Sequence, residues 1–246
     1  MSVSKLGRIP LTPLVLAALL LWSEQGAAYR PFESTDADVA AAAELEIELG
    51  YFSAERSAGT NTFLVPQAVL NYGLTDSLEI VGEFEIAKPE GRSGDVDDVG
   101  LFLKSLLREG VLQDSGGLSV AIEGGLLLPA HGGEQTGLEA IGIFSGRAGA
   151  FTYHLNVGAG LDRGDHARFA LWGGIIEYPL SDMLRLVGEL SGERVRGEAK
   201  ESSALVGFIW ESPTTGNAFD GALRRGTSSA APDWELTLGW TFSLPR

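Results

Sequence analysis

Residues 234–243 read Trp-Glu-Leu-Thr-Leu-Gly-Trp-Thr-Phe-Ser, with a large apolar or aromatic residue at nearly every second position. The positions between them carry glutamate, threonine, glycine or serine. Successive side chains of a β-strand point to opposite faces, so this spacing predicts a strand with one apolar and one polar face. A helix would scatter the alternating residues around its axis, so we do not expect one here.

The same period of two recurs along the chain, most regularly at residues 44–51 and 78–86, where glutamates alternate with apolar residues. The predicted strands are 42–53, 61–72, 76–87, 97–107, 117–129, 137–145, 150–161, 167–178, 182–193, 202–211, 217–225 and 232–243. Each is long enough to cross a bilayer at a steep tilt, and an even number places both termini at the same end. Tight turns such as 73–76 and 179–182 alternate with longer charged connections such as 88–95, as in outer-membrane barrels.

Alternation fits a soluble barrel as well as a membrane barrel, because the two differ in which face points inward. Aromatic residues near predicted strand ends, such as Tyr72 and Trp210, match the girdles found at membrane interfaces. Twelve strands would also enclose a space too wide for side chains to fill as a dry core. We therefore expect an all-β, antiparallel up-and-down transmembrane β-barrel over residues 42–246, preceded by a periplasmic segment over 29–41. A soluble periplasmic barrel or sandwich is the alternative.

Residues 1–28 have the pattern of a secretory signal peptide. Lys5 and Arg8 precede a hydrophobic stretch from Leu11 to Trp22, and residues 26–28 form a small-residue cleavage site. The apolar stretch is too short to span a bilayer as a helix. The pattern predicts export, cleavage after Ala28 and location in the outer membrane of a Gram-negative cell.

The net charge restricts the partners of the chain. Lys plus Arg number 18 against 33 Asp plus Glu, which gives a formal charge of −15. This balance argues against nucleic acid as a partner and against docking on anionic lipid. The absence of cysteine suits a chain that crosses an oxidising periplasm unfolded. The acidic excess must therefore lie on loops or in a hydrated interior.

The polar strand faces are expected to line the lumen of the barrel. The predicted lumen-lining residues, a candidate permeation path, are Glu44, Glu46, Glu48, Glu79, Glu83, Glu85, Lys104, Glu123, His154, Asn156, Arg185, Glu189, Glu193 and Glu235. Only Lys104 and Arg185 among them are fixed cations, with Arg224 a further candidate. Facing carboxylates repel one another unless water and cations lie between them, so we predict a hydrated lumen that favours cations. The alternative is that the charges hydrate a narrow, plugged interior.

Catalytic or metal chemistry finds little support in the sequence. The three histidines, His131, His154 and His166, lack metal-ligand spacing, and the acidic stretch 94–98 lacks the frame of a calcium loop. His154 and Asn156 share a polar face, as in some outer-membrane lipid hydrolases, but no serine stands at the matching spacing. We expect no enzymatic activity, no cofactor and no metal, with a lipid hydrolase as the minor alternative.

Several short motifs of the chain resemble those of the MetA-pathway phenol-degradation transporter-like family. They are residues 30–37 (Arg-Pro-Phe-Glu-Ser-Thr-Asp-Ala), 70–76, 98–100 with Lys104, 126–129, 154–158 and 238–243. The resemblance implies an outer-membrane barrel that passes small aromatic or other hydrophobic compounds, and it brings no catalytic residues. One departure is the C-terminus, where Leu244-Pro245-Arg246 follows Phe242, whereas such barrels commonly finish on an aromatic residue.

The sequence thus predicts a passive channel for small solutes. Its expected partners are outer-membrane lipid, a small-molecule solute and, during biogenesis, the barrel-assembly machinery. A structural or binding barrel that does not conduct is the alternative.

Overall fold

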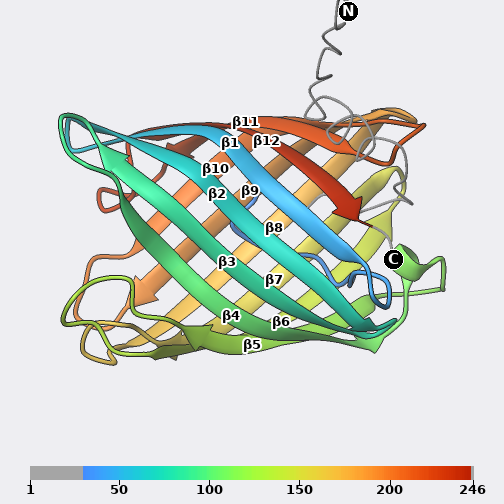
Figure 1. Ribbon diagram of the computed structural model, residues 1–246. Coiled ribbons are helices and arrows are strands. Elements are labelled where there is room, and N and C mark those ends of the chain that lie inside the picture. Colours follow the sequence, from blue (N-terminus) through green and yellow to red (C-terminus); the bar gives the residue numbers. More distant parts are fainter. Residues whose placement is uncertain (1–29, 245–246) are drawn as a thin grey trace, which may run out of the picture.

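A computed structural model describes residues 30–244, which form a closed barrel of twelve antiparallel strands (Figure 1). The strands are β1 (Leu45–Ser57), β2 (Thr60–Thr75), β3 (Leu78–Pro89), β4 (Asp95–Arg108), β5 (Ser119–Leu127), β6 (Gly137–Ala148), β7 (Phe151–Leu161), β8 (Arg168–Ser181), β9 (Leu184–Val195), β10 (Glu201–Glu211), β11 (Ala218–Gly226) and β12 (Trp234–Leu244). The predicted all-β up-and-down barrel is confirmed, and each of the twelve predicted segments coincides with one strand. The predicted signal peptide, residues 1–28, lies outside the described residues.

One short helical element escaped prediction. A 3-10 helix, η1 (Val111–Gln113), lies in the connection between β4 and β5. No helix in residues 30–244 has the length and apolar character needed to span a bilayer.

The barrel closes because β1 pairs with β12 along its length, from Leu45 opposite Leu244 to Arg56 opposite Trp234. Each of the strands from β2 to β11 pairs with the strand before it and the strand after it in the chain. Closure removes the unpaired strand edges that a membrane would not tolerate, since lipid offers no partner to a backbone N–H or C=O group.

The apolar strand faces point away from the lumen. On β7, Val157 exposes 64 % of its surface, whereas its neighbour Asn156 exposes 2 %. On β4, Leu103 exposes 47 % and the adjacent Lys104 only 5 %. A soluble barrel would show the reverse arrangement, so the outer surface is built to contact an apolar medium.

The two ends of the barrel differ in their connections. At the end where β1 begins and β12 finishes, here called the terminal end, residues 76–77, 149–150 and 182–183 form two-residue turns. At the opposite loop end, residues 128–136 and 162–167 form longer connections. The exception at the loop end is the β1–β2 turn, where Ala58 and Gly59 both have positive φ, of 48° and 84°. That backbone matches the right-handed twist of a tight hairpin, and glycine adopts it without strain.

Residues 30–42 lie inside the barrel, so the prediction of a periplasmic segment over 29–41 needs correction. Backbone N–H groups of this segment donate hydrogen bonds to inward-facing side chains of β1, β3, β6, β7 and β9. Figure 1 shows the segment in blue, ahead of β1 and within the ring of strands. We call residues 30–42 the plug.

The outward face of β7 provides a test of the lipid-facing surface. We expect Val157→Arg to destabilise the barrel by about 2–4 kcal/mol, the cost of a cation on the lipid face near the bilayer midplane. The free energy of unfolding, measured by denaturant titration in phospholipid vesicles with tryptophan fluorescence, checks this value. Val157→Leu is the matched control, and an Arg variant as stable as the Leu variant would contradict the assigned orientation.

Candidate functional site

The barrel wall holds the plug through the plug's own backbone. The side-chain amide of Asn156 accepts a hydrogen bond from the Thr35 N–H (2.9 Å) and donates one to the Thr35 carbonyl (2.7 Å). The Glu189 carboxylate accepts the Ser34 N–H at 2.8 Å. Four further N–H groups of the plug donate to side chains of the wall: that of Arg30 to Glu48, that of Glu33 to Glu189, that of Ala37 to Ser145 and that of Ala40 to Glu79. These bonds replace the secondary-structure partners that the extended plug lacks.

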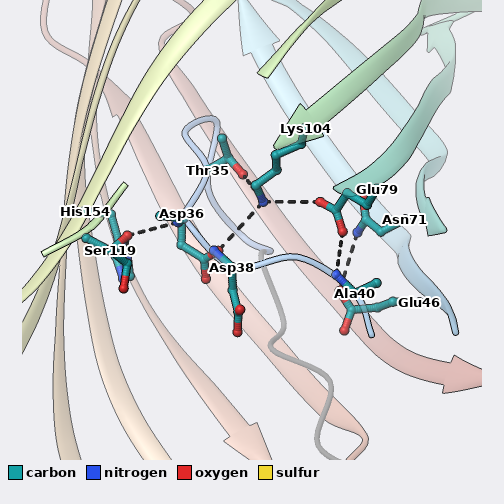
Figure 2. Close-up of polar contacts among 12 residues, drawn as sticks. Thr35, Asp36, Asp38, Ala40, Glu46, Asn71, Glu79, Lys104, Ser119 and His154 are labelled. Atoms are coloured by element: carbon teal, nitrogen blue, oxygen red, sulfur yellow. Dashed lines mark hydrogen bonds and ion pairs between the residues drawn. The ribbon is translucent and has the colours of Figure 1, made fainter. Parts of the chain in front are cut away.

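A buried lysine ties two strands to the plug (Figure 2). The Lys104 Nζ on β4 lies 3.4 Å from Glu79 Oε1 on β3 and 3.8 Å from Asp36 Oδ1 in the plug. It also donates to the Thr35 hydroxyl at 3.4 Å. A charged group at this depth requires a partner, and Lys104 has one from the wall and one from the plug.

A second cation, Arg224 on β11, collects three carboxylates. Its guanidinium lies 3.0 Å from Glu189, 3.1 Å from Glu33 of the plug and 3.4 Å from Glu235. Sequence analysis named Arg224 only as a further candidate, and the structure makes it the centre of this cluster. The cluster links three strands with the plug, whereas the Lys104 cluster links two.

The plug brings a third cation that sequence analysis left out of the lumen. The Arg30 Nε lies 3.7 Å from the Asp220 carboxylate on β11. Gly239 faces the same guanidinium, and a Cβ atom there would overlap it. Glycine on a polar strand face was thus a usable sign of close packing inside the lumen, although it does not say which group packs there.

The η1 turn reaches the plug from the terminal end. The Gln113 side-chain amide donates to Asp38 Oδ1 at 2.9 Å and to the Ala37 carbonyl at 3.4 Å. Burial, together with the charge of Asp36, raises the pKa of Asp38 above its ordinary value. The long β4–β5 connection, unusual for this end of the barrel, therefore supports the plug.

His154 has a serine partner that the sequence did not reveal. Ser145 lies opposite His154 in the β6–β7 ladder, with its Oγ 2.8 Å from His154 Nδ1, and His154 Nε2 lies 3.1 Å from Glu177 Oε1. The three residue types match a hydrolytic triad. Ser145, however, is fully buried, and its Oγ accepts the N–H of Ala37. The arrangement anchors the plug and leaves the serine no access to a substrate.

A cavity of about 910 Å³ runs beside the plug, within the size range of small-molecule sites. At the terminal end it touches Ala41 and Glu44, and at the loop end it touches Glu134 and Arg163. One connected space therefore contacts residues at both ends of the barrel.

Most of the predicted lumen residues line this cavity, namely Glu44, Glu46, Glu48, Glu79, Glu83, Glu85, Lys104, Glu123, Asn156, Glu193 and Glu235. The other three, His154, Arg185 and Glu189, contact Glu177, Glu211 or Arg224 rather than the cavity. A role in permeation stays a prediction for all of them. The inward positions of Glu139, Asp220 and the plug residues were not predicted from the sequence. Polar and apolar residues alternate less regularly on β6 and β11, and the plug has no such period.

Comparison with known proteins supports the fold. No family model matches the chain, and no curated protein matches it. Among solved structures it is similar to an outer membrane channel from Pseudomonas putida, with a TM-score of 0.60 and 13% identity over 87% of this chain and 100% of that one. OmpT of Vibrio cholerae and a loop-deletion mutant of it align with TM-scores of 0.36 and 0.39 at 14% identity, covering 87% and 82% of this chain and 100% and 97% of theirs. The similarity to the Pseudomonas putida structure supports the fold of an outer-membrane β-barrel.

The position of the plug can be tested with an engineered disulfide, since the chain contains no cysteine. A Cβ atom at Gly173 would lie 2.8 Å from the Cβ of Ser34, about 1 Å closer than in a disulfide, so a small outward shift of the plug would bring a Ser34→Cys, Gly173→Cys variant to bonding geometry. Non-reducing mass spectrometry of the folded protein should find the crosslink. The control pairs Ser34→Cys with Gly174→Cys, whose side chain would point outward, and equal crosslinking in both variants would contradict the plug position.

The Arg224 cluster should contribute measurably to stability. We expect Arg224→Met to cost about 3 kcal/mol, the lower part of the range for a broken buried pair, because Glu189 stays buried without its cation. Arg225→Met, an exposed neighbour, is the control. Denaturant unfolding in detergent measures both variants, and equal stability would contradict the role of the cluster.

Proposed function

We propose that this protein is a passive channel of the outer membrane, through which small solutes cross by the hydrated space beside the plug. The observation that carries the proposal is that one cavity contacts residues at both the terminal end and the loop end. The plug fills part of the lumen, and the cavity beside it would serve as a route without requiring the plug to leave.

The passage should favour cations. Glu83, Glu123 and Glu139 line it. Glu123 lies opposite Lys104 in the β4–β5 ladder, whereas no hydrogen bond or ion pair is described for Glu83 or Glu139 within residues 30–244. The nearby cations Lys104 and Arg224 are already surrounded by carboxylates. Unneutralised carboxylates around a confined aqueous path attract cations and repel anions.

The orientation and the solute belong to the same proposal. We place the terminal end in the periplasm, following cleavage of the signal peptide, with outer-membrane lipid around the barrel and the assembly machinery as a transient partner. The resemblance to the phenol-degradation transporter-like family suggests small aromatic or hydrophobic solutes. The fully buried Ser145 supports a protein without hydrolytic activity.

Planar-bilayer recording tests the channel directly. Purified, folded protein should give discrete conductance steps, and a salt gradient should give a cation-selective reversal potential. Deletion of residues 30–42 should raise the conductance, because the plug occupies part of the lumen, whereas the oxidised Ser34→Cys, Gly173→Cys variant should keep the basal value.

A difference in gel migration between unboiled and boiled samples verifies that each variant is folded. Folded protein without conductance would favour the structural or binding barrel, and an anion-selective reversal potential would contradict the acidic passage.

A further inference from the structure

The cavity beside the plug has an apolar wall that breaks the polar character of the inward strand faces. Val81, Phe102, Leu127 and Phe169 form one buried cluster, against which Val69 and Leu171 pack. These side chains lie on β2, β3, β4, β5 and β8, and all six line the cavity. A hydrated ion gains nothing from contact with an apolar surface, so an apolar band of this extent indicates a solute with an apolar part.

Carboxylates adjoin the apolar band on the same strand faces. Glu83 lies two residues beyond Val81 on β3, and Glu123 lies four residues before Leu127 on β5. Glu139, on the neighbouring β6, completes the group, and the three share the cavity with the band. Glu123 lies opposite Lys104 in the β4–β5 ladder, whereas no hydrogen bond or ion pair is described for Glu83 or Glu139 in residues 30–244, so these two carboxylates can contact a solute directly.

The two linings together define the chemistry of a ligand. The apolar band favours a compact hydrocarbon or aromatic body, because burying it removes apolar surface from water. The carboxylates favour a positive charge on the same molecule and repel an anion. Among the described residues, no group of three or more His, Cys, Asp or Glu side chains is arranged to hold a metal ion.

We propose that this cavity is a binding site for small organic cations, in which a protonated or quaternary amine meets Glu83, Glu123 and Glu139 while an aromatic or aliphatic body lies on the band of Phe102, Phe169 and their neighbours. The proposal rests on the proposed channel function and narrows its solute class. A neutral aromatic compound would use only the band, and an inorganic cation only the carboxylates.

Four probes separate these contributions: phenethylammonium, 2-phenylethanol and phenylacetate, which share a phenyl ring, and ethylammonium, which has the ammonium without the ring. Isothermal titration calorimetry on the purified full barrel in detergent, with the heat of empty micelles subtracted, measures their affinities. Phenethylammonium should bind about tenfold more tightly than 2-phenylethanol because of its charge contacts, and at least about tenfold more tightly than ethylammonium because of the buried ring, and phenylacetate should not bind. Equal affinity for phenethylammonium and 2-phenylethanol would overturn the proposal.

Matched variants locate the site. The triple variant Glu83→Gln, Glu123→Gln, Glu139→Gln should weaken phenethylammonium about tenfold. The control Glu90→Gln, Glu109→Gln, Glu198→Gln removes the same charge from exposed positions outside the cavity and should leave the affinity unchanged. Leu171→Ala, at the partly buried edge of the band, should weaken phenethylammonium but not ethylammonium. If phenethylammonium binds the triple variant and its control with equal affinity, the assignment of the site to these carboxylates is wrong.

Calorimetry also separates this proposal from the channel itself. Selective binding by a folded protein that does not conduct would support the site and reject the channel. Conductance without selective binding of phenethylammonium would reject the site and leave the channel intact.

Discussion

The structure depends on the partnering of polar groups inside a closed ring of strands. Closure satisfies the backbone groups of the strands, and the apolar outer face requires that polar side chains point inward. Inside, buried charges such as Glu79 and Glu189 are costly unless each meets a cation or a donor. The plug supplies several of these donors, so the lumen wall and the plug form one polar network.

That network explains why an irregular segment is held in the centre of the barrel. The plug has no strand partners, and its N–H groups bond instead to carboxylate, amide and hydroxyl groups of the wall. Lys104 and Arg224 then bridge the carboxylates of both parts, so removal of the plug would leave cations and anions of the wall with fewer partners. Glu83 and Glu139, for which no partner is described in residues 30–244, line the cavity instead.

The strands were predictable because their signal is local. A strand with one face toward lipid and the other toward the lumen repeats its chemistry every two residues, so Leu45, Ile47 and Leu49 already separate from the glutamates between them. For the site, the sequence predicted which side chains face the lumen but not which groups they contact. Alternation correctly gave the inward positions of Glu48 and Asn156, but their partners Arg30 and Thr35 come from a segment without a period. Ser145 was missed for a different reason: its contact with His154 joins the neighbouring strands β6 and β7, and the pairing register between strands cannot be read from one sequence.

The sequence by itself determined the number of strands, their order and, on the regularly alternating strands, which residues face each way, because a period of two and the short turns between strands are properties of neighbouring residues. Tertiary structure alone decided that residues 30–42 fill part of the lumen and which ion pairs form there, because those contacts join residues far apart in the chain. It also decided that Val81, Phe102, Leu127 and Phe169 meet as one apolar band, since only closure of the barrel brings β3, β4, β5 and β8 around a common space.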